Sequence, residues 1–291
     1  MTEAVSRNDN RALEGQLATG AHPSVRFGEL QRTALHQAAY LNNEACLITL
    51  LRYGAVMNTE DAKGDTAMHL AAWCGNVESL AALLRHGADT DWLSGRDGYS
   101  PLWCAINGHQ IDVARVLLKY GARVSLRAAS GRGLMPLHQA AVTGQSAMCE
   151  LLLERGAQVN CLDDDKNMPL HHAAAIGSVP SVQVLLGGGA DIEARQANGL
   201  TALHWAAHKG HAEVLGVLLD HAARIDTRVE DQGACALHLA AIRGHTAAAS
   251  VLVERGANRD LFAVGWDGTC GTPIEMARKR GKSKVVKILS K

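Results

Sequence analysis

The chain lacks a net charge and long apolar runs. Its 29 Lys and Arg residues are balanced by 29 Asp and Glu residues, so no overall electric field would draw it to nucleic acid or to an anionic membrane. The N-terminal stretch has no apolar run that could serve as a signal sequence, and no later run is long enough to cross a bilayer. We therefore expect neither secretion nor membrane insertion, and a nucleic-acid partner is not favoured.

The chain also lacks the cysteine spacing of a disulfide framework. It has seven cysteines, an odd number, and none forms a CxxC pair. Most of them stand among apolar residues with helical spacing, so reduced thiols are the simplest interpretation. This usage indicates the cytoplasm or the nucleus.

Catalytic motifs are missing as well. The sequence contains no nucleophile elbow and no HExxH. Gly281-Lys282-Ser283 resembles the end of a phosphate-binding loop, but Met276 stands where that loop needs a glycine. The run Gly187 to Gly189 follows a predicted helix and is typical of a helix stop. We expect no enzyme activity, no cofactor, no small-molecule substrate and no metal site.

What the chain does have is one phrase, of the kind Thr-Ala-Leu-His-x-Ala-Ala, that recurs along its length. Copies start at positions 33, 66, 100, 135, 168, 201, 235 and 272, so successive starts lie 33, 34, 35, 33, 33, 34 and 37 residues apart. The copies at Ser100 and Thr272 are the weaker ones. A period in this range predicts a solenoid of stacked helical units.

The repeat that starts at Ser100 shows the expected local structure. Ser100 is a good N-cap and Pro101 suits the first helical position, where no backbone hydrogen bond is lost. A second helix follows a tight break and should end at Gly121, in the left-handed conformation that favours glycine. Ala222 stands where other repeats have this glycine, which should cost about 1 kcal/mol.

Two apolar pairs explain why such short helices must stack, since neither is stable alone. A small Ala-Ala pair in the first helix allows close packing, and a Leu-Leu pair in the second should fill the interior, each buried Leu contributing roughly 1.5–3 kcal/mol. The alanine pairs begin at Ala38, Ala71, Ala140, Ala173, Ala206 and Ala240, and the leucine pairs at Leu50, Leu83, Leu117, Leu152, Leu185 and Leu218.

These residues resemble the ankyrin repeat, whose pattern runs Gly-x-Thr-Pro-Leu-His-x-Ala-Ala-x-x-Gly-His, then an apolar helix ending Leu-Leu, then Gly-Ala-Asp-Val-Asn. Gly210-His211 and Gly156 to Asn160 add to the match. The resemblance implies an all-α repeat solenoid with hairpin fingers between units and a concave groove formed by fingers and first helices.

The expected organisation is one domain over residues 1–291. Residues 1–32 look like a partial N-terminal cap, residues 33–271 hold seven repeats, and residues 272–291 look like a C-terminal capping repeat. The last segment carries lysines and arginines on its outer side, as a terminal cap requires. Its other interpretation, contact with acidic lipid or nucleic acid, is the weaker one.

Six histidines occupy the same slot of the phrase, about one repeat apart. A zinc site needs ligands that converge on one ion, whereas successive repeats separate these rings, so structural hydrogen bonding is favoured over metal binding. Trp103 and Glu275 occupy the slot in two repeats, where we expect local repacking. The six are His36, His69, His138, His171, His204 and His238.

The pair that follows each Ala-Ala should lie on the concave face. Along the chain these pairs change from aromatic and apolar to basic, which would suit a partner with a hydrophobic anchor followed by acidic or phosphorylated residues. The alternative is that Tyr40 and Trp73 pack against adjacent fingers. The candidate contact residues are Tyr40, Leu41, Trp73, Cys74, Asn107, Val142, Ile176, His208, Lys209 and Arg243.

Aromatic residues in or beside the fingers form a second group of candidates. Trp92, Tyr99 and Trp266 could contact a partner or pack within their own finger, and the sequence does not distinguish these. Trp205 directly follows a motif histidine and should be half-buried, which makes it a poor contact candidate. By resemblance, Asn160 and more loosely Asn58 match the finger asparagine that is hydroxylated in some ankyrin proteins.

These patterns predict a non-enzymatic protein-binding module, an adaptor or scaffold, that is monomeric and binds a partner through its groove. One alternative is a substrate-recruiting subunit of a ubiquitin ligase, although no ligase-docking box is expected after residues 272–291. Another is an inhibitor or regulator of a specific enzyme or transcription factor, which would use the same surface.

Overall fold

The computed structural model describes residues 1–95, 98–129, 132–230, 232–265 and 268–290. Within them the chain packs as two compact units, Met1–Gln139 and Ala140–Lys291. Both are built from pairs of short antiparallel helices, one pair per repeat, so the predicted all-α repeat architecture is confirmed. The single-domain organisation stays a prediction.

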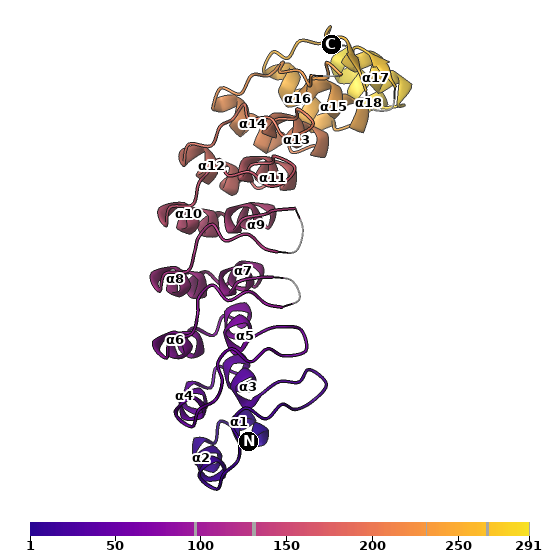
Figure 1. The fold of residues 1–291 in the computed structure, drawn as a ribbon. Helices are drawn as coiled ribbons and strands as arrows, with labels where there is room; N and C mark the ends of the chain where they lie inside the picture. The colour runs from indigo at the N-terminus through magenta and orange to yellow at the C-terminus, as the bar shows by residue number, and fades with distance from the viewer. Residues whose placement is uncertain (96–97, 130–131, 231, 266–267, 291) are drawn as a thin grey trace. The chain divides into compact units, whose positions relative to one another are not determined.

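The first unit begins with a helix pair in the segment that precedes the first motif. Each later pair packs on the one before it, first helix on first helix (α3 on α5, α5 on α7) and second on second (α4 on α6, α6 on α8). In Figure 1 the loops between repeats extend from the side of α3, α5 and α7, away from α4, α6 and α8. The helices are α1 (Thr2–Ser6), α2 (Asn10–Ala18), α3 (Ala34–Tyr40), α4 (Glu44–Arg52), α5 (Ala67–Cys74), α6 (Val77–Arg85), α7 (Pro101–Asn107) and α8 (Ile111–Lys119).

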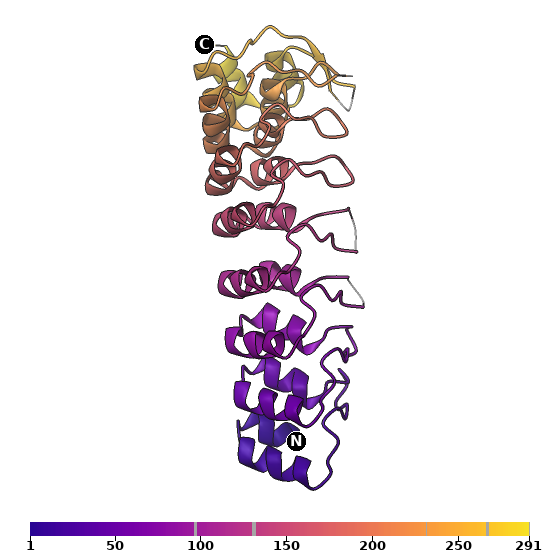
Figure 2. The ribbon, with the colours of Figure 1, turned by 60° about the vertical axis from the view of Figure 1, so that its left-hand side comes forward.

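The second unit follows the same pattern from α9 (Pro136–Val142), which contains the boundary between the units. Figure 2 shows its helix pairs with their loops. Two short strands, β1 (Ala263–Val264) and β2 (Cys270–Gly271), pair antiparallel before the last helix pair. The other helices are α10 (Ser146–Glu154), α11 (Pro169–Ile176), α12 (Val179–Gly187), α13 (Ala202–Lys209), α14 (Ala212–Asp220), α15 (Ala236–Arg243), α16 (Thr246–Glu254), α17 (Pro273–Lys279) and α18 (Ser283–Leu289).

The core lies between the first and second helices of each repeat. The alanine pairs are fully buried, as Ala38, Ala39, Ala206 and Ala207 show at 0% exposure. In the leucine pairs only the first residue is always buried. The second is half-buried in five of the six pairs, because one step along a helix turns the side chain about 100° away from the core. The prediction that both leucines fill the interior was therefore only half right.

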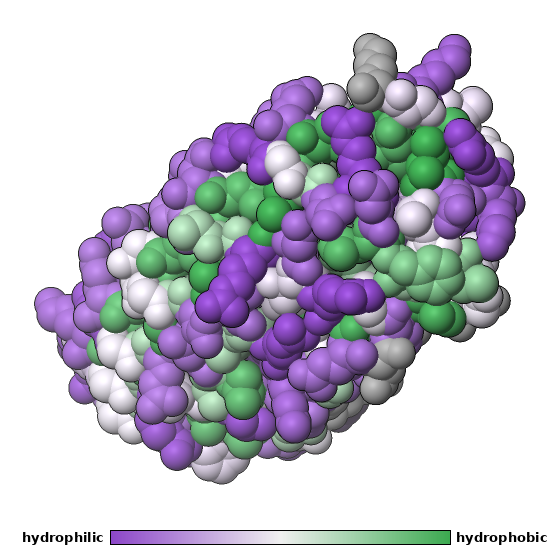
Figure 3. All heavy atoms as spheres, turned by 90° about the horizontal axis from the view of Figure 1, so that it is seen from above, coloured by the Kyte–Doolittle hydropathy of each residue, from purple (hydrophilic) through white to green (hydrophobic). Residues whose placement is uncertain are grey.

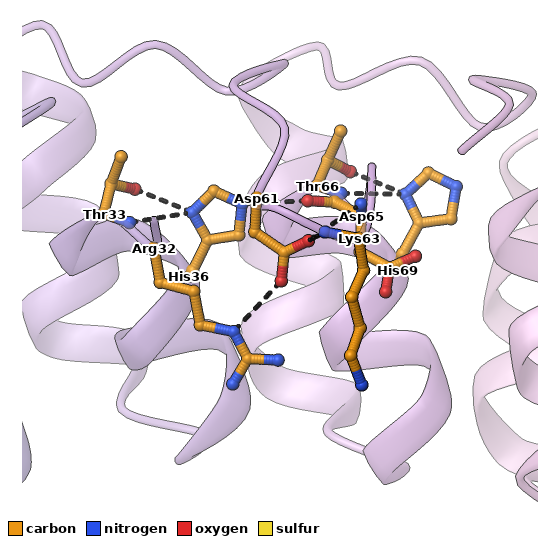
Figure 4. A network of polar contacts seen from close by, with 8 residues as sticks. All are labelled: Arg32, Thr33, His36, Asp61, Lys63, Asp65, Thr66 and His69. Carbon is orange, nitrogen blue, oxygen red and sulfur yellow. Dashed lines mark hydrogen bonds and ion pairs between the residues drawn. The ribbon is translucent and has the colours of Figure 1, made fainter. Parts of the chain in front are cut away.

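The motif histidines cap one helix and tie it to the next finger. In α3, His36 Nδ1 accepts the backbone N–H of Thr33 at 3.1 Å and the Thr33 hydroxyl at 2.9 Å. Its other ring nitrogen, Nε2, therefore carries the proton and donates to the Asp65 carbonyl at 3.0 Å. Figure 4 shows this arrangement repeated at Thr66 and His69. Each imidazole replaces the glutamate of a capping box and adds a bond between repeats.

The two repeats without this histidine keep half of the arrangement each. Trp103 Nε1 donates to the Leu126 carbonyl at 3.1 Å, which reproduces the bond to the next finger. Glu275 accepts the backbone N–H of Thr272 at 2.9 Å, which reproduces the cap. Glu275 belongs to the last repeat, where no further finger follows in the described residues. At these two positions, therefore, Trp103 keeps the bond to the next finger and Glu275 keeps the helix cap.

Ala222 follows α14 with φ of 65° and is exposed, so it adopts the left-handed conformation without being glycine. We expect Ala222→Gly to raise the free energy of unfolding by about 1 kcal/mol, since glycine has no Cβ to strain there. A urea unfolding curve followed by circular dichroism measures the change. Ala197 is the matched control, because it is exposed and its φ is not positive. Ala197→Gly should destabilise the protein, and a loss of stability in both variants would contradict the prediction.

Candidate functional site

The surface formed by the first helices and the fingers, which we call the first-helix face, carries a hollow in the first unit. The hollow has a volume of about 530 Å³ and opens between α3, α5, α7 and their fingers. Aromatic, apolar and charged side chains share its wall. It is lined by Arg32, Tyr40, Lys63, Asp65, His69, Leu70, Trp73, Cys74, Tyr99, Cys104 and Asn107.

Tyr40 and Trp73 are the most exposed aromatic side chains at this hollow, at 47% and 52%. The Arg32 guanidinium lies over the Tyr40 ring, 5.6 Å from its centroid. Arg32 Nε also donates to the buried Asp61 carboxylate at 3.1 Å, which fixes its position (Figure 4). The face of an aromatic ring attracts a cation, so this contact favours the observed position of Tyr40 at the edge of the hollow. Half of the area of each aromatic residue remains available to a partner.

Charge at this hollow is nearly balanced. Arg32 is paired with Asp61, and the hollow is also lined by Lys63 and Asp65. In Figure 4 the Lys63 ammonium extends away from the network around Asp61. The hollow therefore offers chiefly aromatic and apolar area, which suits an uncharged anchor residue.

The finger aromatics pack locally. Trp92 is half-buried and its Nε1 donates to the Glu60 carboxylate at 3.3 Å. Tyr99 stacks on Trp103, with ring centroids 5.5 Å apart and planes 11° from parallel. Local packing thus accounts for most of both side chains, although Tyr99 also lines the hollow. Trp266 lies outside the described residues.

The other candidates of the first unit and of the boundary helix differ in exposure. Leu41 is 38% exposed, whereas Cys74, Asn107 and Val142 are half-buried. The Asn107 side-chain oxygen accepts a hydrogen bond from Gln139 at 2.8 Å, which leaves it less free to contact a partner. Burial raises the pKa of the Cys74 thiol, so the group stays protonated at neutral pH and is a weak nucleophile.

In the second unit the candidates fall into an apolar and a basic part. Ile176 is 53% exposed at the end of α11. Lys209 and Arg243 are exposed at the ends of α13 and α15, and His208 beside them is half-buried. Arg243 Nε donates to His208 Nε2 at 2.9 Å. Ile242 was expected on the surface with Arg243, but it packs against the buried cluster of Ala234, Ala263 and Met276.

A second hollow, of about 290 Å³, opens between α13, α15 and the preceding finger. Leu200, Trp205 and Leu239 form its apolar wall, and His208 and Arg243 line it with two finger amides. Trp205 is half-buried, as expected. The repeat pattern does not predict that Trp205 lines a hollow, because the neighbouring side chains come from the finger before it and the repeat after it.

The two asparagines proposed for hydroxylation are both exposed. Asn160 is tied to the next repeat, because its side-chain oxygen accepts the backbone N–H of Asp191 at 2.9 Å and its amide donates to the Gly189 carbonyl at 3.3 Å. This bridge across repeats gives Asn160 a structural role. Hydroxylation of Asn160 or Asn58 stays a prediction.

Among the described residues, no three or more His, Cys, Asp or Glu side chains are grouped so that they could hold a metal ion. Burial raises the pKa of the Cys149 thiol to about 12, which keeps it protonated. In the same part of the chain, no helix combines the length and apolar character needed to cross a membrane.

On the face shown in Figure 3, hydrophobic residues appear as patches interrupted by hydrophilic side chains. Recognition of a partner on a surface of this kind depends on local hollows and single anchor residues. The hollow beside Tyr40 and Trp73 and the hollow beside Trp205 are such places on the first-helix faces.

One comparison with known proteins bears on this geometry. A family model described as ankyrin repeats (3 copies) matches the chain in five overlapping stretches, which together cover residues 1–263. The stretches are residues 1–92, 35–128, 83–163, 137–231 and 170–263.

Proposed function

Because this chain belongs to the ankyrin-repeat family, we propose that it is a non-enzymatic adaptor or scaffold that binds a protein partner on its first-helix faces. Ankyrin repeats are general protein–protein interaction modules, and the family is typically non-enzymatic. We assign the contact surface to the first-helix face of the first unit, with Tyr40 and Trp73 as its anchor residues.

One observation carries the assignment. Tyr40 and Trp73 hold about half of their area open to solvent beside a hollow of about 530 Å³. Large aromatic residues are the commonest hot spots of protein interfaces, and a hollow of this size can admit one or two side chains of a partner. The partner is therefore expected to insert an apolar or aromatic residue between Tyr40 and Trp73.

A double variant, Tyr40→Ala with Trp73→Ala, tests these anchors. We expect proteins captured by the wild-type chain to be lost from the variant, and a purified partner to bind the variant at least about tenfold more weakly. Affinity capture with quantitative mass spectrometry identifies the partner, and calorimetry measures its affinity.

Tyr53 and Tyr120 provide the matched control. They are exposed to a similar degree, 41% and 44%, but lie at the ends of α4 and α8, which are second helices. Tyr53→Ala with Tyr120→Ala should keep every partner. Equal capture by both double variants would mean that Tyr40 and Trp73 are not the anchors.

A further inference from the structure

The hollow of the second unit differs from that of the first in its charge. Arg32, Arg85, Arg123 and Arg255 each pair with a carboxylate within 3.1 Å. Arg243 instead donates its Nε to the neutral acceptor His208 Nε2, and it has no carboxylate partner within the described part of the chain. Its positive charge is thus oriented but not neutralised.

The protonation of His208 follows from this contact. Arginine can only donate, so His208 Nε2 accepts, and a neutral ring must then carry its proton on Nδ1. Burial, with the nearby positive charges of Arg243 and Lys209, lowers the pKa of His208 to about 4. The ring is therefore neutral at physiological pH and cannot repel an anion that approaches Arg243.

Two residues that line this hollow, Trp205 and His208, each hold a buried ring nitrogen that has no hydrogen-bond partner among the described residues. His208 Nδ1 and Trp205 Nε1 are buried without a partner in the described structure. The two rings meet edge to face, with centroids 5.9 Å apart. Both atoms lie below the surface, so a ligand would first meet the outer nitrogens of Arg243.

Because Arg243 Nε is engaged with His208, a ligand would meet the two outer nitrogens of the guanidinium. These two nitrogens can donate to both oxygens of a carboxylate at once. Leu200, Trp205 and Leu239 form an apolar wall beside it. A volume of about 290 Å³ is small for a cofactor and fits one or two side chains. Lys209, exposed one residue after His208, adds a second positive charge.

We propose that this hollow is a carboxylate pocket that binds an Asp or Glu side chain of a partner segment, with the neighbouring apolar residue of that segment against Trp205. The Arg243 fork holds the carboxylate and His208 holds the fork in place. The inference rests on the proposed function, because it specifies which partner segment the second unit accepts.

The test uses a library of random heptapeptides displayed at the N-terminus of a phage coat protein, so that no peptide has a free carboxyl terminus. The full chain is the bait, and Arg243→Gln is the counter-selection bait. We expect enriched peptides to share an Asp or Glu beside a bulky apolar residue. Synthesised as C-terminal amides, they should bind Arg243→Gln at least about tenfold more weakly than wild type.

Arg255→Gln is the matched control, because Arg255 is an exposed arginine of the same repeat that is paired with Asp220. It should leave peptide affinity unchanged. Binding should also shift the indole N–H resonance of Trp205, which is identified by its absence in Trp205→Phe. The proposal is overturned if the wild type enriches no acidic peptide over Arg243→Gln, if Arg255→Gln weakens binding equally, or if the Trp205 resonance does not move.

The outcomes separate the pocket from the proposed function. The Tyr40 and Trp73 variants act in the first unit and leave Arg243 intact. If Arg243→Gln loses acidic-peptide binding, the pocket is supported. If the Tyr40/Trp73 double variant also retains all natural partners, those two anchors are contradicted while the pocket stands. The reverse result would contradict the pocket alone.

Discussion

Acid should destabilise this protein well above the pH at which carboxylates titrate. The motif histidines are buried, and burial lowers the pKa of His36, His69, His171, His204 and His238 below the ordinary value of 6.5. For His204 the pKa falls to about 4. The unfolded chain therefore binds protons at a higher pH than the folded chain does.

The sign of the effect follows from that difference. Stability rises with pH wherever the unfolded state binds more protons. The contribution of His204 is therefore fully present above pH 6.5 and is lost as the pH falls from 6.5 to about 4. For His204 alone this loss corresponds to about 3 kcal/mol. The other four histidines act in the same direction.

Urea unfolding followed by circular dichroism near pH 7 and near pH 5 measures this loss. The urea concentration at the transition midpoint should be lower near pH 5 than near pH 7, because the unfolded chain takes up protons that the buried imidazoles do not. His86 and His221 are exposed histidines that suit as controls. Replacing both by Ala should leave the fall in the midpoint in place, because the buried motif histidines remain. A midpoint that is the same at both pH values would contradict a structural role for the buried, neutral imidazoles.

The second large effect is expected from His204→Ala. This change removes the bonds from His204 Nδ1 to the Thr201 backbone N–H (3.2 Å) and hydroxyl (2.8 Å), and from Nε2 to the Thr227 carbonyl (3.0 Å). The variant would have a cavity where the imidazole was, and the buried polar groups of Thr201 would lose their partner. Together these should lower the free energy of unfolding by about 3 kcal/mol or more.

His221→Ala is the matched change in the same repeat. His221 is exposed, and its Nδ1 forms a hydrogen bond with the Val217 carbonyl at 2.9 Å, within its own helix end. Its loss should cost less than about 0.5 kcal/mol. His204→Ala should also flatten the pH dependence of the unfolding midpoint, since the group that titrates is gone. If the two variants were equally stable, the capping role of the motif histidine would be wrong.

Much of the fold could be predicted because its determinants are local. Pro101 after Ser100 starts α7, and the left-handed Gly121 ends the following helix as expected. The positive φ at Ala222 was predicted from the same repeat position. In each case the residues that decide the conformation lie within one helix turn of it.

The candidate sites could be predicted only in part. The repeat pattern placed Tyr40, Trp73 and Ile176 at exposed positions, and they are exposed. It did not predict that Ile242 would turn to the core, or that Tyr99 would stack on Trp103. Those outcomes depend on which side chains of neighbouring repeats happen to be large or small.

Local sequence was enough to predict a stack of ankyrin repeats, because most repeats carry their own helix caps, stop signals and apolar stripe within about 33 residues. Which polar groups meet depends on the packing of adjacent repeats, which the repeat pattern does not specify. Arg243 contacts His208 across 35 residues of sequence, and Arg32 contacts Asp61 across 29. Arg32 is neutralised by a carboxylate and Arg243, among the residues that the structure describes, is not. This difference arises only when the packing of adjacent repeats brings these side chains together.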